Sequence, residues 1–147
     1  MQTLAQDNAF AGIRTARHAG STGALWTGRC LSALAVLFLA FDSIGKLLEV
    51  QPVVDGAAQL GYPARLVFRL GVILFLCVAA YVIPQTSALG AVLLTGYLGG
   101  AMAAHVRVES PLFSHTLFPT YVALFVWGGL FLRDTRLRAF LPGRARR

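Results

Sequence analysis

Four long apolar stretches dominate this chain and constrain its fold more than any other feature. They cover about residues 25–48, 64–83, 88–106 and 112–132. Each supplies about 20 residues, which at 1.5 Å per residue is enough to cross a hydrocarbon core about 30 Å thick. A single strand cannot satisfy its backbone polar groups in lipid, and these stretches lack the polar–apolar alternation of membrane barrels. We therefore expect an all-α polytopic membrane protein, a bundle of four transmembrane helices.

The composition agrees with a chain that lies mostly in lipid. Of 147 residues, 56% are hydrophobic and only 13% are charged, about half of the charged fraction that is usual in soluble domains. Such a chain is neither disordered, nor a nucleic-acid-binding module, nor an ordinary cytosolic enzyme. We expect a polar N-terminal segment at 1–24, a transmembrane domain at 25–132 and a basic tail at 133–147. The expected surroundings are the lipid bilayer, with no nucleic acid partner.

The distribution of lysine and arginine predicts the orientation. Four spans place both termini on one side, together with nine of the thirteen basic residues, six of them arginines in the tail. The opposite side holds the other four. The positive-inside rule therefore predicts cytoplasmic termini, in a bacterial inner membrane. The same rule accounts for the positive charge of the tail, which therefore does not indicate nucleic-acid binding.

The connections between the stretches are unequal in length. Pro84 closes the second stretch, and residues 85–87 form a tight turn, so the second and third helices should be an antiparallel hairpin. The first loop, 49–63, is longer, and its residues 53–60 can form a short amphipathic helix. Pro63 suits the first position of the second span, because its missing N–H needs no partner there. Pro119 either kinks the fourth helix or marks its true start.

Polar residues enter the spans mainly near their predicted outer ends. Asp42 is the deepest, roughly 10 Å inside the hydrocarbon boundary at 1.5 Å per residue. Lys46 follows at i+4 and can pair with Asp42; alternatively Lys46 extends outward and Asp42 pairs with Arg69. His105 and Glu109 repeat the i, i+4 spacing. The candidate outer pocket comprises Asp42, Lys46, Arg69, His105, Arg107 and Glu109.

Two interpretations of this cluster stay open. It is either an interhelical ion-pair network that sets helix register, or a polar pocket whose acid, base and cationic groups surround a ligand head. Quinone is the natural ligand, because histidine and aspartate can hydrogen-bond its carbonyls and carry protons. No metal is expected, since the chain lacks a dense His/Cys cluster, and Cys30 and Cys77 form no C-x-x-C pair. No motif identifies a catalytic residue.

The third stretch is rich in small residues. Gly96, Gly99 and Gly100 include a G-x-x-x-G pattern, which lets two helices approach closely in lipid. These glycines are predicted to pack either inside the chain's own bundle or against a second copy or a partner subunit.

Several motifs resemble the DoxX-like family of four-helix membrane proteins. They are Leu60-Gly61-Tyr62-Pro63, Ile83-Pro84, Gly96-Tyr97-Leu98-Gly99-Gly100-Ala101 running to His105-Val106-Arg107, Trp127-Gly128-Gly129-Leu130, Leu132-Arg133-Asp134, and Phe41-Asp42-Ser43-Ile44-Gly45-Lys46-Leu47. The resemblance covers about residues 31–142 and, more distantly, extends to the membrane subunit of thiosulfate:quinone oxidoreductase. Members often carry a glutamate in the second helix after Leu-Gly-Val, where this chain has Leu74 and Phe75, so Asp42 is the remaining acid within the spans.

Two functional hypotheses follow. In the first, the protein is a small membrane component of a quinone-linked or redox-stress complex, and a partner subunit supplies the redox group. In the second, it is a non-enzymatic scaffold or accessory subunit that docks a partner through the third helix or the basic tail. A transporter has little support, because 147 residues without an inverted repeat are too few unless the chain forms a homo-oligomer.

Overall fold

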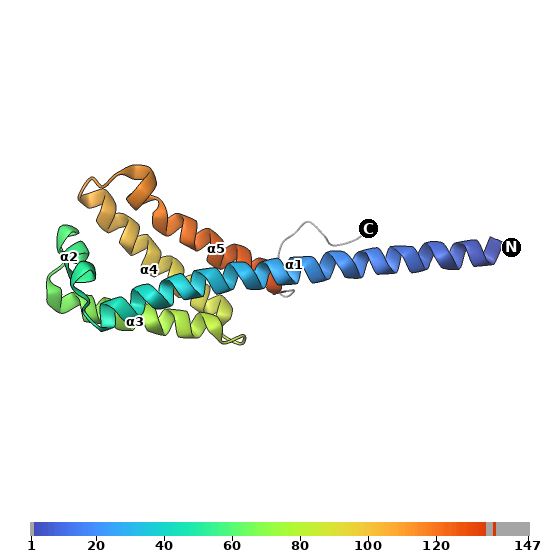
Figure 1. Ribbon diagram of the computed structural model, residues 1–147, viewed down its shortest axis with the longest axis horizontal. Coiled ribbons are helices and arrows are strands. Elements are labelled where there is room, and N and C mark those ends of the chain that lie inside the picture. Colours follow the sequence, from blue (N-terminus) through green and yellow to red (C-terminus); the bar gives the residue numbers. More distant parts are fainter. Residues whose placement is uncertain (1, 135–136, 138–147) are drawn as a thin grey trace.

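A computed structural model of the protein describes residues 2–134 and 137, with side chains from Thr22 onward (Figure 1). Its helices are α1 (Gln2–Leu47), α2 (Gln51–Gln59), α3 (Ala64–Val82), α4 (Ser87–Arg107) and α5 (Phe118–Arg133), with a π-helical turn, η1, at Leu112–Thr116. The described chain contains no strand. This confirms the all-α fold class.

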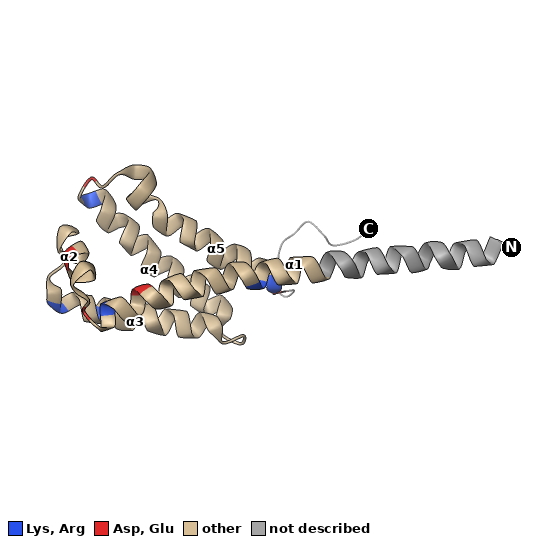
Figure 2. Cartoon of the chain, in the orientation of Figure 1, with Lys and Arg blue, Asp and Glu red and all other residues tan. Residues whose placement is uncertain are grey.

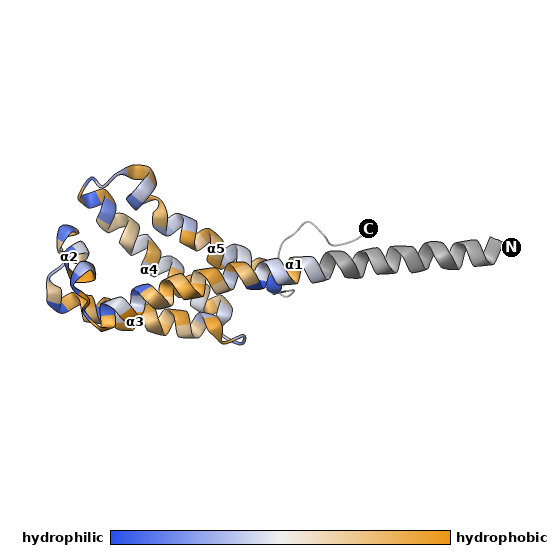
Figure 3. Ribbon diagram, viewed as in Figure 1, coloured by the Kyte–Doolittle hydropathy of each residue, from blue (hydrophilic) through white to orange (hydrophobic). Residues whose placement is uncertain are grey.

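Four helical segments are long and apolar enough to cross a membrane. They are Thr22–Leu47, Ala64–Val82, Ser87–Arg107 and Leu112–Arg133. Apolar residues run along them between the two ends of the bundle (Figure 3), and the charged residues of the described chain lie mainly toward those ends (Figure 2). The protein is therefore a multi-pass membrane protein, as the hydropathy pattern predicts.

The first helix differs from the prediction. We expected a loose polar segment through residue 24, but α1 is continuous from Gln2. The segment 2–24 contains no proline and is rich in alanine, which is the best helix former, so nothing in it interrupts a helix that is already nucleated by the apolar stretch. Of the predicted basic tail, 133–147, only Arg133, Asp134 and Leu137 lie within the described residues.

Prolines mark the helix ends close to where the sequence places them. Pro63 is the residue immediately before α3, and Pro84 follows the last residues of that helix. The tight turn between α3 and α4 is confirmed, and the Thr86 hydroxyl donates to the Ala80 carbonyl oxygen at 2.8 Å. Pro119 lies in the first turn of α5, so it marks the helix start rather than a kink. The short helix predicted at 53–60 is α2.

The four spanning helices form a ring. α1 packs against α3 and α5, and α4 packs against the same two helices from the opposite side. The core between them contains Leu39, Leu74, Leu94 and Leu130, all fully buried. Tyr81 of α3 is also fully buried, and its hydroxyl donates to the Val126 carbonyl at 2.8 Å and lies 2.9 Å from the Ser32 hydroxyl. This residue joins three helices at the end of the bundle that carries the α3–α4 turn, which we call the turn end.

Glycines do bring helices together, but they are not the predicted ones. A Cβ atom at Gly28 would lie 2.7 Å from the Leu132 Cβ, and one at Gly129 would lie 2.7 Å from the Ser32 nitrogen, so these residues permit the α1–α5 contact. Gly90 does the same between α3 and α4. Cβ atoms at Gly96, Gly99 and Gly100 would meet no atom within 4 Å. Packing of these three inside the chain's own bundle was therefore the wrong alternative, because α4 turns that face outward.

Candidate functional site

The ion pair between Asp42 and Lys46 is the deepest charged feature of the bundle end that carries α2, which we call the α2 end. Both residues lie on α1, one helical turn apart, and the Lys46 ammonium donates to a carboxylate oxygen of Asp42. The Lys46 side chain is 17% exposed and the Asp42 side chain is 32% exposed. The predicted i, i+4 pair is confirmed. The alternative, in which Asp42 pairs with Arg69, is not observed, and Arg69 is exposed.

Close packing of α1 against α3 places this pair. Gly71 of α3 lies against Lys46, and a Cβ atom on the glycine would lie 2.8 Å from the Lys46 Cβ. The neighbouring Ser43 is fully buried and donates to the Gly71 carbonyl oxygen at 3.4 Å. The absence of a side chain at Gly71 therefore lets the charged turn of α1 sit directly on α3.

Arg107 was predicted to share a pocket with Asp42, but it makes a structural contact with the end of α2 instead. It is the last residue of α4, and its guanidinium donates to the Leu60 carbonyl oxygen at the end of α2. The contact needs Gly61, which has φ +78° and on which a Cβ would lie 2.9 Å from an Arg107 nitrogen. Arg107 therefore joins α4 to the α2–α3 connection.

The predicted i, i+4 relation between His105 and Glu109 is wrong. α4 ends at Arg107, and Glu109 has φ +53° in the loop that follows, so the helical spacing is broken before it is complete. His105 instead approaches Ser110, with 3.1 Å between Nδ1 and the hydroxyl oxygen. Its ring lies 5.9 Å from that of His115 in η1. The described residues contain no group of three or more potential metal ligands of the His, Cys, Asp and Glu types.

A cavity lies beneath α2 at this end of the bundle, and we call it the Tyr97 cavity. It has a volume of about 230 Å³ and lies between α2, α3 and α4. Its lining is mostly apolar and small, with two tyrosines: Ala57, Leu60, Tyr62, Leu70, Gly96, Tyr97, Gly100, Ala101 and Ala104. Gly96 and Gly100 are exposed, so the cavity opens on the outward side of α4. The glycines that were expected to pack helices instead form one wall of a cavity.

Tyr97 connects the cavity to the ion pair. The Asp42 carboxylate and Tyr62 both lie close enough to interact electrostatically with its hydroxyl. That hydroxyl has no hydrogen-bond partner within the described chain. None of the six predicted pocket residues lines the cavity, although Asp42 interacts with Tyr97 and Arg107 donates to Leu60 on its wall. The sequence motifs included Tyr62 and Tyr97, but neither was predicted as a site residue. The signal that could have indicated the cavity is Tyr97 between Gly96 and Gly100, two glycines spaced four residues apart on one helix.

The fold and the cavity define a small multi-pass membrane protein with a mostly apolar cavity at one end of a four-helix bundle. The sequence model of the DoxX-like family matches residues 30–129, and the chain belongs to that family. Neither a curated protein nor a solved structure matches the chain significantly.

Proposed function

We propose that this DoxX-like protein is a small membrane subunit of a quinone-linked oxidoreductase or redox-stress complex, and that a quinone ring binds in the Tyr97 cavity. A partner subunit would supply the electron donor. The proposal places the chain in a bacterial inner membrane with both termini cytoplasmic, in agreement with the distribution of its basic residues. The observation that carries it is an apolar cavity, open at membrane level, with an unpartnered Tyr97 hydroxyl on its wall.

The residues of the cavity fit a quinone ring. Its volume of about 230 Å³ is below the range of about 300–1,000 Å³ that is typical for drug-sized ligands, so it suits one ring rather than a large cofactor. Gly96 and Gly100 present bare backbone, against which a flat ring can lie. Because both are exposed, an isoprenoid tail can leave between them into lipid without entering the core.

Each polar residue has a specific part in this proposal. The Tyr97 hydroxyl donates a hydrogen bond to a quinone carbonyl oxygen, which satisfies the hydroxyl and orients the ring. The Asp42 carboxylate lies within electrostatic range of Tyr97, and Lys46 holds that carboxylate in place. A bound quinone accepts electrons and protons; the chain's own residues hold the ring and exclude water from it.

The test uses two leucine substitutions on α4 that differ by one position. Gly100→Leu puts a side chain into the cavity, whereas Gly99→Leu puts the same side chain on an open part of the helix outside it. Neither new Cβ meets an atom within 4 Å, so both variants should fold. A short-chain ubiquinone analogue is titrated against the purified protein in nanodiscs. Forcing a ligand against the leucine should cost about 1–3 kcal/mol, which weakens binding by about 5-fold to 150-fold in Gly100→Leu only. Equal affinity in both variants would remove the proposal.

The open glycine face also supports a second candidate function, that of a non-enzymatic accessory subunit. Gly96, Gly99 and Gly100 leave a bare strip on α4 that a helix of a partner or of a second copy can approach closely. The same variants separate the two functions. Gly99→Leu should abolish chemical crosslinking to a partner or a second copy if the strip is a helix contact, and should leave crosslinking unchanged if the strip serves only the cavity.

A further inference from the structure

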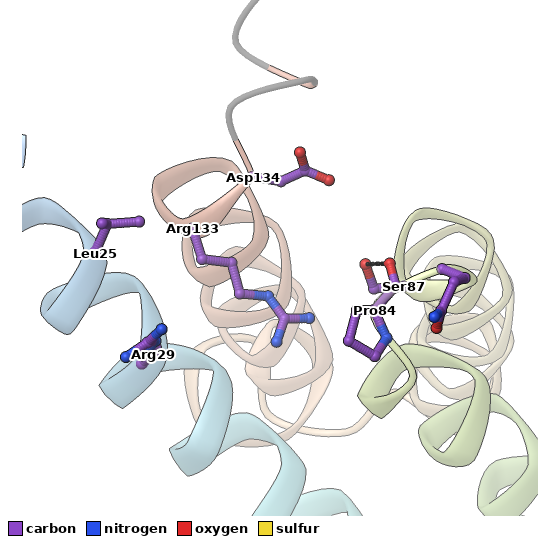
Figure 4. A pocket seen from close by; sticks show the side chains of 7 residues that line it. Leu25, Arg29, Pro84, Ser87, Arg133 and Asp134 are labelled. Atoms are coloured by element: carbon purple, nitrogen blue, oxygen red, sulfur yellow. Dashed lines mark hydrogen bonds between the residues drawn. The ribbon is translucent and has the colours of Figure 1, made fainter.

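A second pocket lies at the turn end of the bundle, at the opposite end of α3 from the Tyr97 cavity. It has a volume of about 490 Å³ and is lined by residues from α1, from the α3–α4 turn and from the end of α5: Leu25, Arg29, Pro84, Gln85, Ser87, Arg133 and Asp134 (Figure 4). We call it the Arg29–Arg133 pocket. It brings together two arginines that are more than a hundred residues apart in the sequence.

Arg133 makes two contacts with Tyr81 beside this pocket. One guanidinium nitrogen donates to the Tyr81 carbonyl oxygen at 3.2 Å, and the guanidinium carbon lies 4.8 Å from the centre of the Tyr81 ring. The bond satisfies one of the carbonyl groups that the end of α3 leaves without a helical partner. Because a guanidinium carries five N–H donors, most of those on Arg133 remain available to a ligand.

Arg29 has no hydrogen bond or ion pair within the described chain. Its guanidinium carbon lies 5.8 Å from the centre of the Trp26 ring, which is a cation–π contact and leaves the N–H edges unoccupied. The Asp134 carboxylate also borders the pocket, but in the close-up it points away from the Arg133 guanidinium (Figure 4). The Arg29 guanidinium therefore lines the pocket without an anionic partner among the described residues.

The first turn of α4 forms a third side. Ser87 begins this 21-residue helix and lines the pocket, and its hydroxyl donates to the Pro84 carbonyl oxygen at 3.2 Å (Figure 4). The first N–H groups of a helix have no partner within it, and the helix dipole favours negative charge there. Two guanidinium groups and a helix start around one pocket match the three acceptor oxygens of a phosphate group.

We propose that the Arg29–Arg133 pocket binds a phosphate group. Its position at the ends of the membrane-spanning segments is the level of lipid headgroups, so an anionic phospholipid presents phosphate there, and phosphate in solution presents the same chemistry. The site is independent of the Tyr97 cavity and of the proposed quinone, because it shares no lining residue with that cavity.

The experiment compares the full chain in nanodiscs of phosphatidylcholine alone, of phosphatidylcholine mixed with phosphatidylglycerol, and of phosphatidylcholine with inorganic phosphate added. There are two readouts. The first is the thermal unfolding midpoint, and the second is the amount of phosphatidylglycerol that stays bound after delipidation, measured by native mass spectrometry. Phosphatidylglycerol should raise the midpoint of the wild type, and Arg29→Gln should weaken its retention about tenfold or more, since one set of charge-assisted hydrogen bonds is lost.

Two further variants control for charge and folding. Arg65→Gln removes the same charge from an exposed residue at the other end of α3 and should leave retention unchanged. Arg29→Lys keeps the charge without the planar fork and should give intermediate retention. A rise with inorganic phosphate that depends on Arg29 supports the site and identifies free phosphate as the ligand. Equal effects of Arg29→Gln and Arg65→Gln, or no rise in the midpoint with either phosphatidylglycerol or inorganic phosphate, would overturn the proposal.

Discussion

Replacing Gly90 by alanine puts a methyl group into the contact between α3 and α4. A Cβ atom there would lie 2.7 Å from the Ala80 carbonyl carbon and closer still to the Tyr81 backbone, about 0.7 Å or more short of an ordinary contact at 3.4 Å. Backbone atoms cannot rotate away as a side chain can, so the two helices have to separate. Gly90 therefore tests whether this crossing holds the bundle together.

The expected size of the effect follows from that geometry. Overpacking of a core costs about 1–3 kcal/mol, and the backbone position of the obstacle favours the upper end, about 3 kcal/mol. The gain in helix propensity from glycine to alanine offsets about 0.5–1 kcal/mol. The net loss should be about 2 kcal/mol, roughly a 30-fold change in the unfolding equilibrium. Gly96→Ala, on the same helix, meets no atom within 4 Å and should change stability by less than about 1 kcal/mol.

The assay is unfolding of the purified variants by increasing sodium dodecyl sulfate in mixed micelles, followed by tryptophan fluorescence. Trp127 is a useful probe, because its indole nitrogen donates to the Thr95 hydroxyl of α4 at 2.8 Å and so reports on the α4–α5 contact. If Gly90→Ala unfolds at the same detergent fraction as Gly96→Ala, the crossing does not depend on Gly90 and the reasoning is refuted. A large loss in Gly96→Ala would instead mean that Gly96 packs against a second chain.

Three further predictions follow from the described contacts. Tyr81→Phe removes the hydroxyl that joins α1 to α5 and should cost about 1–2 kcal/mol in the same detergent assay; an unchanged midpoint would contradict this. Asp42→Ala and Lys46→Ala should each destabilise by about 2 kcal/mol, and the double variant by less than their sum, because each single change leaves one charge unpaired in the spans; additive losses would show that the pair is not coupled. A reporter enzyme fused after Arg147 should be active only in its cytoplasmic form, and a periplasmically active fusion would reverse the predicted orientation.

Local patterns were enough for the parts of the fold that depend on nearby residues. The four spans follow from hydropathy, because lipid accepts a polar backbone only when hydrogen bonds within the helix satisfy it. The α3–α4 turn follows from Pro84, and the Asp42–Lys46 pair follows from the helical repeat alone. Each of these needs only a few consecutive residues and the surrounding solvent.

The candidate site depended on contacts between distant segments, and there prediction was incomplete. The i, i+4 relation between His105 and Glu109 assumed that α4 continues, but the helix stops at Arg107, where its guanidinium bonds to the end of α2. His105 was a predicted pocket residue, yet its approach to His115 depends on how η1 packs against α4. No local pattern contains that information.

The glycines make the division clearest. The sequence by itself determined that four apolar helices cross a membrane and that α4 carries a small-residue strip, because composition and spacing decide these properties. Only the tertiary structure decided that Gly28, Gly71, Gly90 and Gly129 lie at the helix crossings while the strip at 96–100 faces outward and borders a cavity. The physical reason is that hydropathy specifies which segments enter lipid but not how each helix is rotated about its axis. That rotation is set jointly by all the side chains that have to fit between neighbouring helices.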